Sequence, residues 1–154
     1  MGQANSASGS KETATILIFG ASGDLTARKL LPALFALWKN GYLSDHAPIV
    51  GVARRHKSDD GFREEMLQAL QKAHQCDSAS PEELKNFVKR LFYREADLTH
   101  PEEFVRLRKE IEGIEESHNP SHRRLAYLAT APSLFLPTVQ GMHHAEMIPD
   151  PHAD

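Results

Sequence analysis

Hydrophobic residues in this chain fall into two alternating patterns, one typical of buried strands and one typical of amphipathic helices. Four runs are short, apolar and rich in β-branched or aromatic residues, as the strands of a buried parallel sheet are. These runs lie at residues 13–19, 47–53, 91–95 and 125–129. The first run ends at Gly20, where a tight turn can begin.

Between these runs, apolar residues recur at three- and four-residue spacings, which predicts helices with one buried face. Pro32 lies inside the first helix and removes a backbone donor, so we expect a kink there. Ser80 to Glu83 and Thr99 to Glu102 have capping-box spacing, which predicts helix starts at these points. The predicted helices cover residues 24–39 and 59–73, a segment from residue 81, a segment through residues 104–111, and residues 133–142.

Strand and helix alternate along the chain, an order that favours a parallel sheet with helices on both faces. We therefore predict an α/β fold, a Rossmann-like doubly wound and mostly parallel sheet of about four strands. Right-handed crossovers would place the loops that follow the strands along one edge of the sheet. The expected folded unit is residues 13–142, between a leader at 1–12 that we expect to be disordered and a flexible tail at 143–154.

Composition narrows the class of protein. The chain has 154 residues and a formal charge of −3, so no overall positive field favours nucleic acid or an anionic membrane as a partner. No apolar run approaches the roughly 20 residues that span a bilayer. The single cysteine, Cys76, cannot form an intrachain disulfide, and a reducing cytoplasm is the expected compartment.

The segment of residues 20–27 carries the first candidate chemistry. Gly20 and Gly23 stand between an apolar strand and an amphipathic helix, where glycines let backbone N–H groups approach an anion closely. The positive end of the helix would favour a phosphate there, and Ser22 and Thr26 could add hydroxyl donors. The GxxG spacing is shorter than the usual GxGxxG, so a purely structural turn stays an alternative. The segment fits a P-loop poorly, because no Gly-Lys-Ser/Thr follows.

A pair of arginines, Arg54 and Arg55, follows the second predicted strand directly. In a dinucleotide-binding fold this position faces the adenosine ribose, where an acidic residue favours NAD and an arginine accommodates the 2′-phosphate of NADP. A guanidinium can bind phosphate through two parallel hydrogen bonds. A solvated basic turn is the alternative, but the position at the strand end favours a phosphate contact.

A family resemblance begins at the glycine turn. Glucose-6-phosphate dehydrogenases open with a GASGDL turn followed by a basic, leucine-rich helix, and this chain is similar in the segment ILIFGASGDLTARKLLPALFALWKNGYL. The resemblance continues in the family's order through the segments GVARR, FREEM, FYREADL and LAYLATAPSLF. It covers about residues 15–139. It implies a truncated NADP-binding domain of an enzyme that oxidises the C1 hydroxyl of glucose 6-phosphate, with hydride passing to NADP, in the pentose phosphate pathway.

By this resemblance, the dinucleotide-binding turn would be formed by Gly20, Ala21, Ser22, Gly23, Asp24, Leu25, Thr26 and Ala27. Arg54 would contact the 2′-phosphate, and Asp97 and Leu98 would line the coenzyme edge after the third strand. Phe135 stands where an aromatic residue of the family approaches the coenzyme. Ala131 replaces the first of two adjacent prolines that are common in the family, which leaves the shape of that loop open.

Two family segments with roles in the reaction do not occur in this sequence. They are Glu-Lys-Pro-Phe-Gly, with a substrate-binding lysine, and Arg-Ile-Asp-His-Tyr, whose histidine is the expected general base. His100 fits a helix start, and His143, His144 and His152 lie in the predicted tail, so none replaces that base or forms a metal site. We therefore assign no catalytic residue and no metal, and we expect glucose 6-phosphate to bind only a full-length relative.

Other interpretations fit the same pattern. A non-catalytic nucleotide-binding or interaction module left by truncation would carry the same glycine turn. A short NADP reductase of another family fits less well, because no Tyr-x-x-x-Lys pair occurs. Truncation would also leave an edge strand and a sheet face uncovered, so we expect an isolated chain that is marginally stable or self-associates.

Overall fold

The computed structural model describes residues 13–23, 26–119 and 123–148. Four parallel strands form one sheet in the order β3-β2-β1-β4. The strands are β1 (Thr15–Phe19), β2 (Ile49–Ala53), β3 (Leu91–Glu95) and β4 (Arg124–Leu128). The helical elements are η1 (Thr26–Leu30), α2 (Leu31–Lys39), α3 (Asp59–Lys72), η2 (His74–Cys76), α4 (Pro81–Val88), α5 (Pro101–His118), η3 (Pro132–Leu134) and α6 (Phe135–His144). The predicted leader at 1–12 lies outside the described residues.

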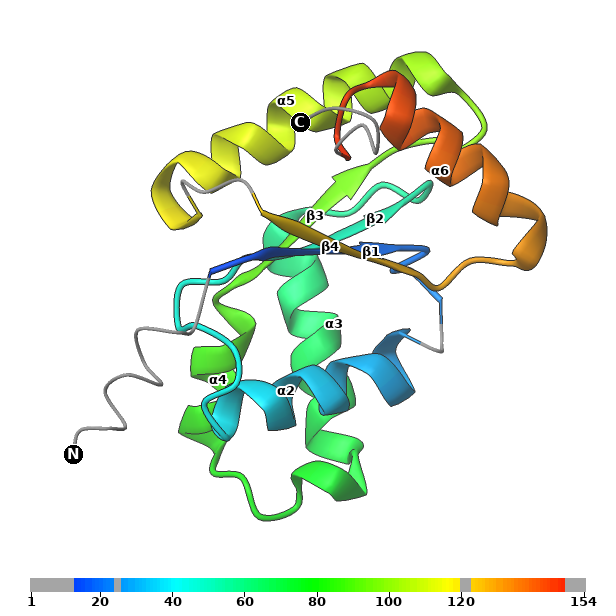
Figure 1. Ribbon diagram of the computed structural model, residues 1–154. Helices are drawn as coiled ribbons and strands as arrows, with labels where there is room; N and C mark the ends of the chain where they lie inside the picture. The colour runs from blue at the N-terminus through cyan, green and yellow to red at the C-terminus, as the bar shows by residue number, and fades with distance from the viewer. Residues whose placement is uncertain (1–12, 24–25, 120–122, 149–154) are drawn as a thin grey trace.

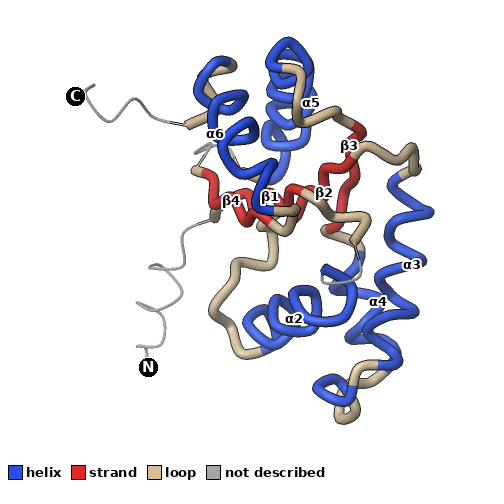
Figure 2. The backbone as a smooth tube through the Cα atoms, turned by 90° about the vertical axis from the view of Figure 1, so that its right-hand side faces the viewer, coloured by secondary structure: helices blue, strands red, loops and turns tan. Residues whose placement is uncertain are grey.

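Helices cover both faces of the sheet (Figure 1). Helices α2, α3 and α4 lie on one face, and α5 and α6 lie on the other (Figure 2). The predicted α/β, Rossmann-like parallel sheet is therefore confirmed. Because β2 and β4 flank β1, the chain reverses its direction of sheet growth after β3, and ligands of such folds bind at this switch point. No helix among the described residues combines the length and apolarity that crossing a membrane requires.

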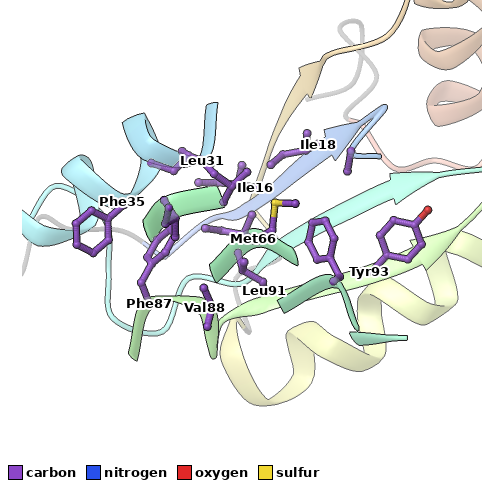
Figure 3. Close-up of a cluster of buried hydrophobic side chains, with 14 of the residues drawn as sticks. Ile16, Ile18, Leu31, Phe35, Met66, Phe87, Val88, Leu91 and Tyr93 are labelled. Atoms are coloured by element: carbon purple, nitrogen blue, oxygen red, sulfur yellow. The ribbon is translucent and has the colours of Figure 1, made fainter. Parts of the chain in front are cut away.

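The core has two halves, one on each face of the sheet. Side chains alternate along a strand, so Ile16 and Ile18 pack with α2, α3 and α4, while Leu17 and Phe19 pack beneath α5 and α6. Every residue of β1 and β2 is buried, as expected for central strands covered on both faces. Figure 3 shows the first half, where β1 residues meet the aromatic ring of Phe87 and its neighbours.

Two helix starts follow from local chemistry. At α4 the predicted capping box is present, since Ser80 Oγ accepts from the Glu83 N–H at 3.1 Å and Glu83 Oε1 accepts from the Ser80 N–H at 3.0 Å. The kink expected at Pro32 stays a prediction, and the helix type changes just before that residue. Thr26–Leu30 is a π-helix, and the α-helix begins at Leu31, so that proline falls in its first turn, where a missing N–H costs no hydrogen bond.

The predicted capping box at Thr99 is wrong. Helix α5 begins at Pro101 with His100 as its N-cap residue and without a side-chain cap. The Asp97 carboxylate competes for the threonine, because it accepts both the Thr99 N–H at 2.9 Å and the Thr99 hydroxyl at 2.7 Å. Glu103 then accepts the backbone N–H of Asp97 at 3.0 Å. Hydrogen bonds to the side chain and the backbone of Asp97 thus hold the loop after β3.

The folded unit also extends past residue 142. Helix α6 continues to His144, and Ala145 and Met147 are buried against the half of the core beneath α5. The Arg124 side chain donates to the Met147 carbonyl at 3.3 Å, which ties this segment to β4. The prediction of a flexible tail from residue 143 is therefore wrong as far as Met147, because two apolar residues there add to the core. Residues 149–154 lie outside the described part.

Candidate functional site

The carboxyl ends of all four strands open into one cleft of about 300 Å³. Each strand contributes the residues that directly follow it or end it, so segments far apart in the sequence meet here. The lining residues are Gly20, Ser22 and Gly23 after β1; Ala53 and Arg54 at the end of β2; Ala96, Asp97, Leu98 and Thr99 after β3; and Thr130, Ala131 and Leu134 after β4. This is the edge at which ligands of open α/β sheets bind.

Gly20 shapes the wall of the cleft. Its φ is +90°, a conformation that L side chains rarely adopt. A Cβ at this position would lie 2.8 Å from the Ala129 carbonyl oxygen and 2.9 Å from Thr130 Cγ2. Because glycine has no Cβ, the loop after β1 can lie directly against the loop after β4.

The amide groups of the turn bond largely within the protein. The N–H groups of Gly20 and Ala21 both donate to the Val52 carbonyl, at 2.8 and 3.2 Å, and the Gly23 N–H donates to the Gly20 carbonyl at 3.1 Å. These bonds fasten the turn to β2 and close it upon itself. The two glycines therefore act through backbone shape, and Ser22, exposed between them, is the polar side chain that the described part of the turn contributes to the cleft.

Other residues of the predicted turn have different surroundings. Ala21 is fully buried beside β2, and the Thr26 hydroxyl donates to the Gly20 carbonyl at 3.5 Å. Ala27 lines a different cleft. Asp24 and Leu25 lie outside the described residues. Among the described turn residues, the structure thus brings only the two glycines and Ser22 to the cleft.

Arg54 lies in the same cleft as the glycine turn, exposed at the end of β2. Across from it, hydrogen bonds from Thr99 lower the pKa of the Asp97 carboxyl below its ordinary value, and the charges of His100 and Arg54 lower it further. Asp97 is therefore an ionised carboxylate within reach of the Arg54 field, and Leu98, 7% exposed, gives the cleft an apolar wall.

The loop after β4 completes the cleft differently from expectation. Thr130, Ala131 and Leu134 line it, whereas Phe135, the predicted aromatic contact, begins α6 and is 40% exposed outside the lining. Ala131 is extended and precedes the short η3 helix, so a single proline at Pro132 is sufficient to start that turn.

Tyr93 is a positioning residue that sequence reasoning missed. It is 2% exposed on β3, and its hydroxyl donates to the carbonyl oxygen of Arg55, next to the predicted phosphate contact. Burial raises the pKa of Tyr93 to about 12. Its place inside a predicted strand gave no sign of this role, because the partner comes from another strand's loop.

Metal ligation has no arrangement to support it in the part of the chain described. No three His, Cys, Asp or Glu side chains gather there as a metal site would need. His143 and His144 end α6, and His152 lies outside the described residues.

Comparison with known proteins gives the family. Residues 17–153 match the family described as glucose-6-phosphate dehydrogenase, NAD binding domain. The chain is 38% identical over 132 residues to the glucose-6-phosphate 1-dehydrogenase of Chlamydia muridarum, which covers 86% of this chain and 26% of that protein. It is 40% identical over 133 residues to that of Chlamydia pneumoniae, covering 83% and 25%. The chain thus spans about a quarter of the length of these curated relatives.

Solved structures agree with this comparison. One, described as glucose-6-phosphate dehydrogenase in complex with its substrate glucose-6-phosphate, superposes with a TM-score of 0.73 at 33% identity, covering 86% of this chain and 27% of that chain. Another, glucose-6-phosphate 1-dehydrogenase from Mycobacterium avium, gives 0.72 at 26% identity, covering 88% and 28%. The family's description indicates a nicotinamide dinucleotide as the class of cofactor. The chain belongs to the glucose-6-phosphate dehydrogenase family, as its N-terminal NAD-binding domain.

Proposed function

We propose that this chain is the NADP-binding portion of a glucose-6-phosphate dehydrogenase of the cytoplasm. The observation that carries the proposal is the meeting of the glycine turn, Arg54, Asp97 and Leu98 in one cleft at the carboxyl ends of the strands. If Arg54 and the turn lay on opposite sides of the sheet, no single dinucleotide could touch both. Their common cleft supports one ligand that bridges β1 and β2.

The residues present fit a dinucleotide. Because Gly20 has no Cβ, the loops after β1 and β4 meet to form one wall of the cleft, and a pyrophosphate would lie along that wall. Ser22 would hydrogen-bond that pyrophosphate, and the Arg54 guanidinium would hold the 2′-phosphate of the adenosine ribose. Leu98 would pack against the adenosine. When bound, the nicotinamide ring supplies the hydride acceptor.

The described residues can bind and orient a coenzyme, but the proposal assigns them no proton transfer. Oxidation of glucose 6-phosphate to 6-phosphogluconolactone requires removal of the C1 hydroxyl proton by a base. The segment whose histidine is the expected general base, Arg-Ile-Asp-His-Tyr, does not occur in this sequence. We therefore expect the chain alone to bind NADP without turnover, and we assign the reaction of the pentose phosphate pathway to the longer proteins it resembles.

The test is to titrate the chain with NADP, NAD and adenosine 2′,5′-bisphosphate and to measure each affinity by fluorescence or calorimetry. We expect NADP to bind more tightly than NAD. In Arg54→Ala that preference should fall by roughly tenfold or more, because a charge-assisted hydrogen bond contributes about 1.5–3 kcal/mol. Arg108→Ala, on α5 away from the cleft, is the matched control and should leave the preference unchanged. Equal affinity for NADP and NAD in the unmodified chain would exclude the 2′-phosphate assignment.

A non-catalytic nucleotide-binding module is the second candidate, favoured by a cleft whose described lining includes Arg54 for a phosphate and no histidine. Both candidates bind NADP without turnover. An assay of glucose 6-phosphate oxidation therefore tests whether this chain is an active enzyme instead. A measurable turnover by this chain alone would contradict both.

We also propose that the chain self-associates through β4. This strand pairs only with β1, so its outer edge has no partner strand among the described residues. Leu125 and Tyr127, which point to the same face, are 62% and 43% exposed. An unpaired edge next to exposed apolar side chains favours association.

A further inference from the structure

A second and larger cleft lies on the other side of the glycine turn. It has a volume of about 750 Å³ and runs between η1 and α3. Its basic side chains come from three segments: Arg28 and Lys29 of η1, Lys57 of the loop after β2, and Lys72 of α3. The proposed coenzyme site makes no use of these four residues.

Positively charged side chains gather at this cleft, although the chain as a whole is negatively charged. Among the described residues that line it, four side chains are cationic and one, Glu65, is a carboxylate, in a chain whose formal charge is −3. Lys57 Nζ lies 2.7 Å from Glu65 Oε1, so that carboxylate neutralises a cation already held against Tyr93. Lys29 of η1 and Lys72 at the end of α3 line the same cleft, and both are exposed.

The backbone of η1 contributes to this arrangement. Thr26–Leu30 is a π-helix, a rare form that occurs frequently at functional sites. It places two consecutive basic residues, Arg28 and Lys29, at the cleft, and both are exposed. Two further lining residues, Ala69 of α3 and Ala73 directly after it, have short side chains that leave the cleft open.

We propose that this cleft binds a small molecule that carries two or more linked phosphates, at a site distinct from the coenzyme cleft. Several cations around an open space suit a polyanion better than a single phosphate, because each added negative charge finds its own partner. Ser22 and Gly23 line both clefts, so an occupant here constrains the turn that also forms the coenzyme wall. The proposal goes beyond the coenzyme function and does not depend on it.

The test is calorimetric titration of the full chain with inorganic pyrophosphate and with tripolyphosphate at low and moderate salt. We expect tripolyphosphate to bind more tightly than pyrophosphate, and both to weaken as salt rises. The double variant Lys29→Glu with Lys72→Glu should weaken tripolyphosphate binding by at least roughly tenfold, because two attractions become repulsions. Lys85→Glu with Lys89→Glu, two exposed lysines at α4, is the matched control and should change it less than about twofold.

Three results of these titrations would overturn the proposal. They are an absence of binding at millimolar tripolyphosphate, an equal loss of affinity in the α4 control, and an unchanged affinity in the Lys29 and Lys72 variant.

A competition experiment shows independently which cleft the anion occupies. If adenosine 2′,5′-bisphosphate displaces tripolyphosphate and Arg54→Ala abolishes its binding, the polyanion occupies the coenzyme cleft, and the second site is wrong while the NADP proposal stands. If NADP fails to bind but tripolyphosphate binding depends on Lys29 and Lys72, only the NADP proposal fails.

Discussion

The phenolic hydroxyl of Tyr93 donates a 2.5 Å hydrogen bond to the carbonyl oxygen of Arg55. This bond joins β3 to the loop after β2, one residue beyond Arg54. The same tyrosine packs its ring 5.2 Å from that of Phe62 and lies beneath Lys57, whose Nζ is 5.7 Å from the ring centre. The loop that presents Arg54 is therefore held from below by a buried side chain.

Tyr93→Phe should loosen that loop without removing any group that touches a ligand. It keeps the ring packing and loses one hydrogen bond, so unfolding free energy should fall by about 1 kcal/mol. Affinity for adenosine 2′,5′-bisphosphate should fall several-fold, because Arg54 loses its fixed position, while affinity for adenosine 5′-monophosphate should not change. Calorimetry with both nucleotides measures the difference. An equal loss for both would mean that the tyrosine acts on the whole cleft and not through Arg54.

Alkaline pH should destabilise the fold through the same residue. Burial raises the pKa of Tyr93 from 10.0 to about 12. The folded state therefore keeps its proton where the unfolded state releases it. The stability from this shift is complete below pH 10 and is lost as pH rises toward 12. Denaturant unfolding over that range should show a steeper decline in the parent chain than in Tyr93→Phe. Parallel declines would place the pH dependence elsewhere.

Gly20→Ala should damage both fold and cleft. Alanine would have to adopt a φ of +90° with its methyl 2.8 Å from the Ala129 carbonyl oxygen. Such backbone strain alone costs about 1–3 kcal/mol, and the contact with the Ala129 carbonyl adds to it, so we expect the unfolding free energy to fall by more than the strain alone. Gly113→Ala is the control, since its new methyl within α5 would meet nothing within 4 Å. That variant should gain roughly 0.5–1 kcal/mol. Similar thermal stability for the two variants would contradict the assigned role of Gly20.

A buried ion pair joins α5 to the edge strand. Glu115, 0% exposed in its side chain, accepts from Arg124 Nη2 at 2.6 Å and from the Thr15 hydroxyl at 2.5 Å. Glu115→Ala should cost about 3–5 kcal/mol because it leaves the Arg124 guanidinium buried with less compensation. Adding Arg124→Met should recover part of that loss.

An exposed ion pair on the same helix provides the control for that series. Arg108 and Glu112 are 3.0 Å apart with side chains 38% and 37% exposed. Glu112→Ala should cost less than about 1 kcal/mol. Chemical denaturation of the variants measures each loss, and equal costs for Glu115→Ala and Glu112→Ala would show that burial does not decide the strength of these pairs.

Self-association should depend on the exposed side of β4. An antiparallel pairing of two copies centred on Ala126 would place Leu125 of one copy opposite Tyr127 of the other, twice, and such aromatic–aliphatic pairs stabilise sheets. Sedimentation over a range of concentrations should detect dimers that Leu125→Lys with Tyr127→Lys removes. Tyr42→Lys, at another exposed aromatic residue, in the loop after α2, should leave them intact. A monomer at every concentration would contradict the proposed association.

The strands and the fold class could be predicted because hydrophobic periodicity is a local signal. The strand at 91–95 has its predicted bounds, and the other three differ from theirs by one or two residues. The start of α4 was equally accessible, since a capping box depends on residues three positions apart. The start of α5 was not, because Asp97 competes for Thr99 from outside the helix. The segment after residue 142 also escaped prediction, because its burial depends on contacts with α5.

The candidate site was predictable as a set of strand ends but not as a set of contacts. The glycine turn and Arg54 stand directly after apolar runs, and the order of a parallel sheet brings such positions to one edge. The internal pairing of the Gly20 and Ala21 amides depends on the register of β1 with β2, which no local pattern encodes. The partner of Tyr93 is likewise set by tertiary packing.

Gly51, in the middle of β2, joins these features mechanically. A methyl group there would lie 2.7 Å from Ala21 Cβ and 2.8 Å from the Phe62 ring, so three elements share the volume of a single missing carbon. The turn, the strand and α3 are therefore packed directly against one another at Gly51. A larger residue at position 51 would therefore displace both the turn that lines the two clefts and the helix α3 that lines the larger one.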